Sequence, residues 1–361
     1  MSIVEFSKGG AVQEPNDPTI HHRGSMKPFR LMIVVAFGLL SAKVTAQTTN
    51  DTATPKGLAP IPPEWAVAFS SVEADPHPEK LTRDSHYWVS DERRHDLFRD
   101  TIKDSGGVFI GLGTDQNYLM AAWAKPEVLV PLDFDQMVVN IHYVFRTIFL
   151  NAKTPDEFVA LWSEEQYAST RELLKKDYAD KPEAFTKGIL RAFKQGSKFV
   201  RRRLQRIVKS FGRLGVPTFL SDQSQYDFIV NLFKTNRVFP VRGDLTAKKT
   251  VKQVGDAARK CGLSIRTLYL SNAEQYFKFT PDYRENMISL PYDEKSMVIR
   301  TAGTKQPWTA DGVYDYIAQT ADNFKKWISH DHTYNVWTIV QARKVDKKTG
   351  FSTVTKVPEE E

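Results

Sequence analysis

Glycines and polar residues gather in one short stretch, Gly111-Leu112-Gly113-Thr114-Asp115-Gln116. It follows the apolar run 108–112, a predicted buried strand, and opens a predicted helix over 115–124. Glycines at such a junction let a ligand approach the backbone, and the helix N-terminus offers free N–H groups. Asp133 ends the next predicted strand, where a carboxylate can accept hydrogen bonds from ribose hydroxyls.

Two residues separate this loop from a dinucleotide-binding fingerprint. Gln116 replaces the third glycine, and Asp115 places negative charge where a pyrophosphate would lie. Both disfavour NAD and FAD, so a nucleoside ligand without phosphates, such as S-adenosylmethionine, fits the pattern better. The alternative is a tight strand-to-helix turn in which Asp115 caps the helix and Asp133 is a loop acid.

A second polar group, Ser271, Asn272 and Gln275, follows the predicted strand 263–270. Because the carboxyl ends of parallel strands meet at one crevice, we expect both groups to share it. Amides there suit a neutral polar ligand, although Asn117 and Asn272 can instead cap helices or link loops. The candidate ligand-binding residues are Gly111, Gly113, Asp115, Gln116, Asn117, Tyr118, Asp133, Ser271, Asn272 and Gln275.

Strand and helix signals alternate along most of the chain, which predicts an α/β fold with a doubly wound, mostly parallel sheet. The predicted strands are 108–112, 128–132, 238–241, 263–270, 297–301 and 337–345. The predicted helices are 91–103, 115–124, 137–150, 222–233, 246–261 and 311–328. A helical insertion spans about 152–213, within a single α/β domain over 85–345.

The segment 107–118, with its Gly-x-Gly-x-Asp-Gln-Asn-Tyr pattern, resembles the signature of a bacterial family of unknown activity that has a class I methyltransferase-like, Rossmann-like core. The segment 269–276, Tyr-Leu-Ser-Asn-Ala-Glu-Gln-Tyr, matches a second block of that family. Weaker matches lie at 242–245 and 290–300, so the resemblance covers roughly 85–301. It implies a fold and a cleft and, if the protein is an enzyme, a methyltransferase-like transferase.

The N-terminal region predicts export. Met26 opens a basic segment, an apolar run follows over 31–40, and Val44 and Ala46 occupy the −3 and −1 positions of a signal peptidase site. We predict cleavage after Ala46, with translation starting at Met1 or Met26. The apolar run is too short to cross a bilayer as a helix, so we expect no transmembrane segment in the mature chain.

The segments on either side of the predicted α/β domain differ from it in composition. Residues 47–84 are rich in Pro and Thr, which predicts an arm or linker, and 346–361 reads as a polar tail. The single cysteine, Cys261, excludes an internal disulfide, and we expect it to be buried. The chain has no Gly-x-Ser-x-Gly, His-Glu-x-x-His or P-loop motif, so hydrolase and NTPase activities lack support.

A basic amphipathic helix is the other functional signal. Residues 187–213 carry ten basic side chains and no acid: Lys187, Arg191, Lys194, Lys198, Arg201, Arg202, Arg203, Arg206, Lys209 and Arg213. Such a helix can contact anionic lipid or another envelope component, with nucleic acid the less favoured partner, or it can pack on the core with its charges solvated. His330-Asp331-His332 indicates a polar loop rather than a metal site, and His142 a core histidine.

Two functions follow from these patterns. The first is an exported protein with a site for a small polar or nucleoside-type molecule at the strand ends. The second is a non-catalytic cell-envelope protein whose basic helix meets an anionic surface or partner.

Overall fold

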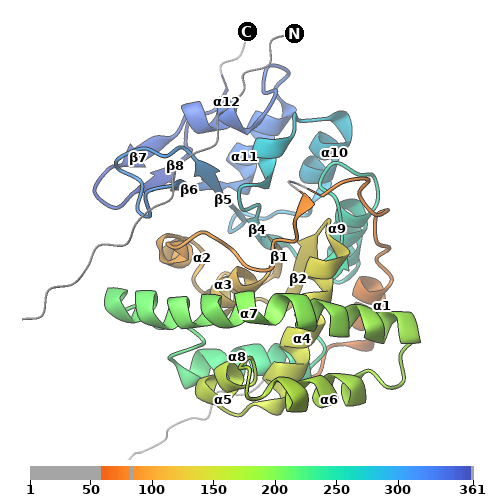
Figure 1. Ribbon diagram of the computed structural model, residues 1–361. Helices are drawn as coiled ribbons and strands as arrows, with labels where there is room; N and C mark the ends of the chain where they lie inside the picture. The colour runs from red at the N-terminus through yellow and green to blue at the C-terminus, as the bar shows by residue number, and fades with distance from the viewer. Residues whose placement is uncertain (1–57, 82–83, 359–361) are drawn as a thin grey trace, which may run out of the picture. The chain divides into compact units, whose positions relative to one another are not determined.

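The computed structural model describes residues 58–81 and 84–358 (Figure 1). These residues form an α/β fold around a mixed, mostly parallel sheet of eight strands in the order β3-β2-β1-β4-β5-β6-β8-β7. The order reverses between β1 and β4, so the segments that follow these two strands leave a crevice between them at their carboxyl ends.

The strands at the two edges of the sheet are the shortest. They are β1 Val108–Leu112, β2 Val128–Asp133, β3 Val241–Arg242, β4 Ile265–Tyr269, β5 Met297–Gly303, β6 Tyr314–Thr320, β7 Lys344–Asp346 and β8 Phe351–Thr353. Neighbours among β1 to β5 pair in parallel, whereas β6 runs antiparallel to β5, and β7 antiparallel to β8. The predicted central strands are therefore confirmed.

Helices cover both faces of the sheet because its strands are apolar on both sides. Phe109 of β1 belongs to one core, and its neighbours Val108 and Ile110 belong to the other. The first core is covered by α3 Asp115–Ala124, α4 Gln136–Asn151, α7 Glu183–Leu214 and α8 Gln223–Lys234. The second is covered by α1 Pro63–Ser70, α9 Thr250–Lys260, α10 Pro281–Ser289, α11 Ala321–Ser329 and α12 Val336–Gln341.

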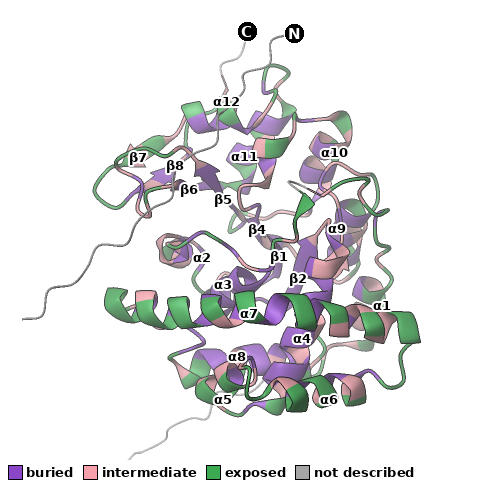
Figure 2. Ribbon diagram, viewed as in Figure 1, coloured by how far each residue is buried: buried purple, intermediate pink, exposed green. Residues whose placement is uncertain are grey.

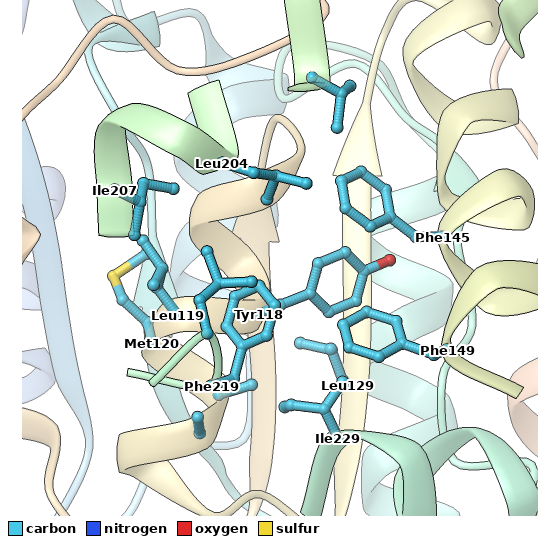
Figure 3. Close-up of a cluster of buried hydrophobic side chains, with 14 of the residues drawn as sticks. Tyr118, Leu119, Met120, Leu129, Phe145, Phe149, Leu204, Ile207, Phe219 and Ile229 are labelled. Atoms are coloured by element: carbon cyan, nitrogen blue, oxygen red, sulfur yellow. The ribbon is translucent and has the colours of Figure 1, made fainter. Parts of the chain in front are cut away.

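The first core is aromatic. Figure 3 shows the Tyr118 ring between Phe145 and Phe149, with Leu129 of β2 and Ile229 of α8 nearby. The ring centroids of Phe145 and Phe149 lie 4.9 and 5.3 Å from that of Tyr118, in tilted and edge-on arrangements that aromatic pairs prefer. This core fixes α3 and α4, the helices that follow the first two strands.

The segment predicted as a helical insertion, about 152–213, contains α5 Pro155–Ala160, α6 Tyr167–Asp177 and most of the 32-residue α7. Buried positions of α7, such as Ile189, Val200 and Ile207, recur at helical spacing and pack on the first core, and α7 packs against α4. Most of the visible face of α7 is exposed in Figure 2. Its apolar side thus joins the fold and its polar side faces solvent.

The prediction of a helix over 311–328 is wrong in its first half. Residues 314–320 form β6, and α11 begins only at Ala321, where the Thr320 hydroxyl accepts a hydrogen bond from the Asn323 N–H at 3.2 Å. Six of the seven β6 residues are buried. A strand buried on both faces has no polar alternation, and its apolar residues can then imitate helical spacing.

The prediction of a strand over 337–345 is also wrong. Asn335 caps α12 by accepting a hydrogen bond from the Trp337 N–H at 3.0 Å, and Val336, Ile339 and Val340 are the buried residues of this helix. Only 344–346 is a strand, β7. The predicted polar tail contains β8, which pairs with β6 and β7.

Two further segments differ from expectation near the start of the described chain. The predicted arm 47–84 contains α1, whose Phe69 is 2% exposed and stacks on Phe239. The predicted helix 91–103 is reduced to the 3-10 turn η2 His95–Phe98 and α2 Arg99–Ile102. It starts late because the Glu92 side chain is held in the site described below.

The predicted signal peptide, 1–46, lies outside the described residues. Within 58–81 and 84–358, none of the helices has the length and apolar character needed to cross a membrane.

Candidate functional site

A pocket of about 420 Å³ opens where β1, β2, β3 and β4 end. The loops after these strands form its floor, and the segment 85–91 borders it. Its lining comprises Ser85, Tyr87, Val89, Ser90, Asp91, Leu112, Gly113, Thr114, Gln116, Asp133, Phe134, Asp135, Val138, Gly243, Asp244, Leu245, Thr246, Ser271, Asn272, Ala273, Tyr276, Phe277 and Tyr314. This is the crevice that the order of the strands predicts.

Half of the ten candidate residues line this pocket: Gly113, Gln116, Asp133, Ser271 and Asn272. The other five are absent from its lining: Gly111, Asp115, Asn117, Tyr118 and Gln275. The loops after β1 and β4 do therefore meet, but each contributes fewer residues than the sequence patterns predicted.

The glycine loop is filled by its own amide side chains. A Cβ atom at Gly111 would lie 1.9 Å from Asn117 Oδ1, and one at Gly113, where φ is +80°, would lie 2.2 Å from Gln116 Nε2. Gln116 Nε2 donates to the Leu112 carbonyl at 2.9 Å, and Asn117 Nδ2 donates to that of Gly113 at 3.0 Å. The glycines thus make room for amides, and these amides occupy space where a pyrophosphate would approach.

Asp115 forms a buried ion pair. Its Oδ2 lies 2.8 Å from Nε of Arg203 on α7, and both side chains are at most 2% exposed. Burial lowers the pKa of the Arg203 guanidinium, but the Asp115 carboxylate, together with the more weakly acting Glu92 and Tyr316, outweighs burial and raises it. Asp115 also accepts a hydrogen bond from the Ser90 N–H at 3.1 Å. Through these two contacts, Asp115 attaches α7 and the segment 85–91 to α3. Arg203 is buried and is therefore not part of the exposed basic face of α7.

Tyr118 is connected to the glycine loop through His142. Its hydroxyl lies 2.8 Å from His142 Nδ1, and His142 Nε2 lies 2.8 Å from the Gly113 carbonyl oxygen. Because a carbonyl only accepts, Nε2 donates and Nδ1 accepts the Tyr118 proton. Burial lowers the pKa of His142 to about 4, so the ring stays neutral. His142 is a buried histidine with both nitrogens bonded, as predicted.

Asp133 is the carboxylate with the most unusual environment in the pocket. Its Oδ1 accepts a hydrogen bond from the Asp135 N–H at 2.9 Å, and no side chain within 58–81 and 84–358 donates to it. Burial, with a contribution from the nearby Asp135 carboxylate, raises the pKa of Asp133 from near 3.8 to about 7. An acid with that pKa and access to a cavity can bind a ligand donor or exchange a proton.

Ser271 and Asn272 follow β4, and Ser271 adopts a φ of +51° that is uncommon for a residue with a side chain. The Ser271 hydroxyl donates to Glu92 Oε1 at 2.9 Å, and Asn272 Nδ2 lies 3.4 Å from the Tyr314 hydroxyl. Gln275 points elsewhere, with its amide 3.5 Å from the Thr301 carbonyl. The loop after β4 is therefore held against β5 and β6.

Glu92 organises this side of the crevice, and no sequence pattern singled it out. It is 1% exposed and accepts hydrogen bonds from Ser90, Tyr269, Ser271 and Thr301, with His95 Nε2 at 2.9 Å. Burial alone raises the pKa of this carboxyl, but the contacts with His95, Thr301 and Tyr269 together lower it to about 2. Glu92 is therefore an anion that the protein itself satisfies.

The blocks that carried the family resemblance meet in space. Residues from 112–116, 243–245 and 271–276 line the pocket together. Glu274 of the second block lies 2.8 Å from the Arg300 guanidinium, a buried ion pair that ties the loop after β4 to β5. The sequence spacing of these blocks reflects one crevice and its support.

Several pocket residues were missed for identifiable reasons. Tyr314 was assigned to a helix and in fact begins β6. Asp135 caps α4 by accepting from the Met137 N–H at 2.9 Å, and its Oδ2 lies 2.6 Å from His86 Nδ1. Its position after a predicted strand, before a long apolar helix, was the signal that could have found it.

Other predicted features lie apart from the pocket. Cys261 is half-buried, short of the full burial expected, and burial raises the pKa of its thiol. No group of three or more His, Cys, Asp or Glu residues within 58–81 and 84–358 could hold a metal ion.

Comparison with protein families gives one match. Residues 87–355 match the family described as Domain of unknown function (DUF7790). The match spans most of the chain, so the protein belongs to this family. No curated protein matches the chain.

Proposed function

We propose that this member of the DUF7790 family is an exported protein that binds a small polar, nucleoside-type ligand in the strand-end pocket. The observation that carries the proposal is the position of Asp133, which ends β2 and lines a cavity of about 420 Å³. A carboxylate in that place can accept hydrogen bonds from a sugar diol.

Further features support this ligand class. The order β3-β2-β1-β4-β5 is that of a Rossmann-like sheet, which supports a methyltransferase-like core. The amides over the glycine loop leave little room for phosphates, which favours a nucleoside without them. S-adenosylmethionine is such a ligand; bound here, it would supply a methyl group for transfer.

The test is a thermal-shift screen of the full chain against nucleosides and S-adenosylmethionine, followed by calorimetry of each compound that binds. We expect Asp133→Ala to weaken binding at least tenfold, whereas Asp180→Ala, which removes an exposed aspartate outside the pocket, leaves binding unchanged. Equal affinity of the two variants would contradict the assignment of the pocket.

Export has a separate test. The basic segment after Met26, the apolar run and Ala46 support cleavage after residue 46. N-terminal sequencing of the protein isolated from cells should begin at Gln47. A chain that retains Met26 would contradict export by this signal.

A second candidate function rests on the basic stripe, defined as Lys187, Arg191, Lys194, Lys198, Arg202, Arg206, Lys209 and Arg213. All eight side chains are exposed on α7, and the stripe is roughly 39 Å long at 1.5 Å per residue. Within the described chain only Lys187 of this set forms an ion pair, with Glu183 at 2.7 Å. Phe199, 49% exposed, lies beside the stripe. We propose that this face contacts an anionic lipid surface.

Vesicle binding tests this second candidate function. The triple variant Arg191→Gln, Lys198→Gln, Arg202→Gln should lose salt-sensitive binding to phosphatidylglycerol vesicles, since each removed charge contributes about 1 kcal/mol. The matched control, Lys344→Gln, Lys347→Gln, Lys348→Gln, removes the same charge from exposed residues elsewhere and should keep it. Equal binding of both triple variants would overturn the proposal.

A further inference from the structure

The lining of the strand-end pocket is acidic. It includes Asp91, Asp133, Asp135 and Asp244, while none of its described residues is a lysine, arginine or histidine. Asp135 has His86 beside it, at 2.6 Å. The other three form no ion pair with any residue of 58–81 or 84–358: Asp91 accepts from the Tyr314 hydroxyl at 2.7 Å and Asp244 from Thr246. Among the residues that the structure describes, the carboxyls of Asp91, Asp133 and Asp244 therefore have no cationic partner.

The same lining is aromatic. Tyr87, Phe134, Tyr276, Phe277 and Tyr314 contribute rings from four separate segments. Tyr87 and Tyr276 are 47% and 52% exposed, so much of their surface lies outside the hydrophobic cores. The faces of aromatic rings carry negative charge density and attract organic cations, most strongly when the site is shielded from water.

Carboxylates and aromatic faces together favour one charge class of ligand. An anionic ligand would meet unpaired carboxylates and, among the described residues that line the pocket, no basic side chain, which carries an energetic cost. A neutral ligand would use the hydrogen bonds of the site and leave its charge uncompensated. A cation uses both the carboxylates and the rings.

We propose that the strand-end pocket takes an organic cation, with its positive charge between the aspartates Asp91, Asp133 and Asp244 and the rings of Tyr87 and Tyr276. This inference rests on the proposed function, because it assumes that the pocket binds a ligand, and it adds the charge class of that ligand. The class includes protonated amines, quaternary ammonium compounds and sulfonium compounds.

Pairs of compounds that differ chiefly in charge provide the test, measured by calorimetry on the full chain. The pairs are choline with its neutral carbon isostere, putrescine with the corresponding diol, and S-adenosylmethionine with S-adenosylhomocysteine. We expect the more cationic member of at least one pair to bind at least tenfold more tightly. Measured above pH 8, where a carboxyl with a pKa of about 7 is ionised, Asp133→Asn should reduce that ratio by threefold or more, because it removes the charge but keeps the shape of the side chain.

Aromatic contact has its own variant. Tyr276→Leu should weaken binding of the cation several-fold, while Tyr334→Leu, which removes a tyrosine of similar exposure outside the pocket lining, should not. Equal affinity within every pair, or binding of neutral nucleosides alone, would overturn the charge inference and leave the proposed function standing. Failure of all six compounds and of the nucleosides to bind would overturn both.

Discussion

Glu92 and Asp133 are both carboxylates at the carboxyl ends of the sheet, but the protein surrounds them differently. Four hydroxyl groups and a histidine contact Glu92. Burial raises the pKa of this carboxyl, but the contacts with His95, Thr301 and Tyr269 outweigh burial and lower it to about 2. Asp133 has backbone N–H groups near it and a cavity beside it, and its pKa is raised to about 7. Because the protein satisfies the hydrogen-bonding capacity of Glu92, this carboxylate stabilises the fold. Asp133 keeps hydrogen-bonding capacity that a ligand can use.

Asp115 belongs with Glu92 in this comparison, since its charge is compensated by Arg203. Together they form the closed side of the crevice, toward β4 and α7, whereas Asp133 and Asp244 form the open side, toward β2 and β3. If this division is correct, substitutions on the closed side reduce stability, and substitutions on the open side affect ligands more than folding.

The largest loss is expected for Asp115→Asn. It leaves the Arg203 guanidinium buried at 2% exposure without its counter-ion, which costs about 3–5 kcal/mol of unfolding free energy. Urea unfolding at neutral pH measures this loss. Arg202→Ala, at the exposed neighbouring position of α7, should change stability by less than about 0.5 kcal/mol.

The double variant Asp115→Asn, Arg203→Met refines this result. It removes both charges and should recover part of the loss, because a neutral pair avoids an uncompensated buried charge. A double variant as unstable as the sum of the single ones would show that the ion pair is not the reason for the loss.

Glu92→Gln should cost about 3 kcal/mol at neutral pH, since the lowered pKa corresponds to about 1.4 kcal/mol per unit. The ordinary pKa near 4.5 falls to about 2 in the folded protein. The wild type therefore keeps this stabilisation above pH 4.5 and loses it as the pH falls toward 2.

Thermal unfolding between pH 5 and pH 2.5 checks the sign. The difference in stability between wild type and Glu92→Gln should narrow over that interval. Asp91→Asn, at the adjacent exposed residue, should show no comparable narrowing. A constant difference would mean that the Glu92 charge does not provide the stabilisation.

Gly111→Ala tests whether the glycine loop serves the protein's own amides. The new methyl group would meet Asn117 Oδ1 and the Phe109 ring, and such overpacking costs about 2 kcal/mol. In the double variant Gly111→Ala, Asn117→Ala, about 1 kcal/mol of the lost unfolding free energy should be recovered. Such energetic coupling is expected between neighbouring residues and not between distant ones. Gly212→Ala, on α7 with open space around it, should instead stabilise by about 0.5–1 kcal/mol.

The sequence predicted the parts of the crevice that depend on local patterns. The apolar runs of β1 and β2, the glycines between β1 and α3, and Asp133 at the end of β2 were all recognisable, because strand ends and turns have short signatures. The same patterns could not decide whether the amides of Gln116 and Asn117 face a ligand or their own backbone. That depends on side-chain direction, which spacing does not determine.

Long-range partners account for what the sequence did not predict. Arg203 lies 88 positions from Asp115, and Glu92 is 177 positions from Tyr269, so no local spacing connects them. Arg203 looked like one member of a basic face until its partner was located. Tyr314 was missed because β6 is buried on both faces and lacks the alternation that identifies a strand.

The smallest expected change, Asp133→Asn, also has the opposite sign. The folded protein holds the Asp133 pKa near 7, well above the ordinary 3.8, so wild-type stability falls as the pH rises from about 4 to 7. Asparagine does not titrate. The whole shift would correspond to about 4 kcal/mol, but Asp133 is only partly buried and solvent screens its charge, so we expect asparagine to be more stable than wild type by about 1–2 kcal/mol above pH 7, with no difference near pH 4. Melting temperatures across that range, without ligand, measure the crossover. If Asp133→Asn instead destabilises the protein at pH 8, as Glu92→Gln is expected to do, then the protein satisfies both carboxylates and the open side of the crevice is a structural feature rather than a ligand site.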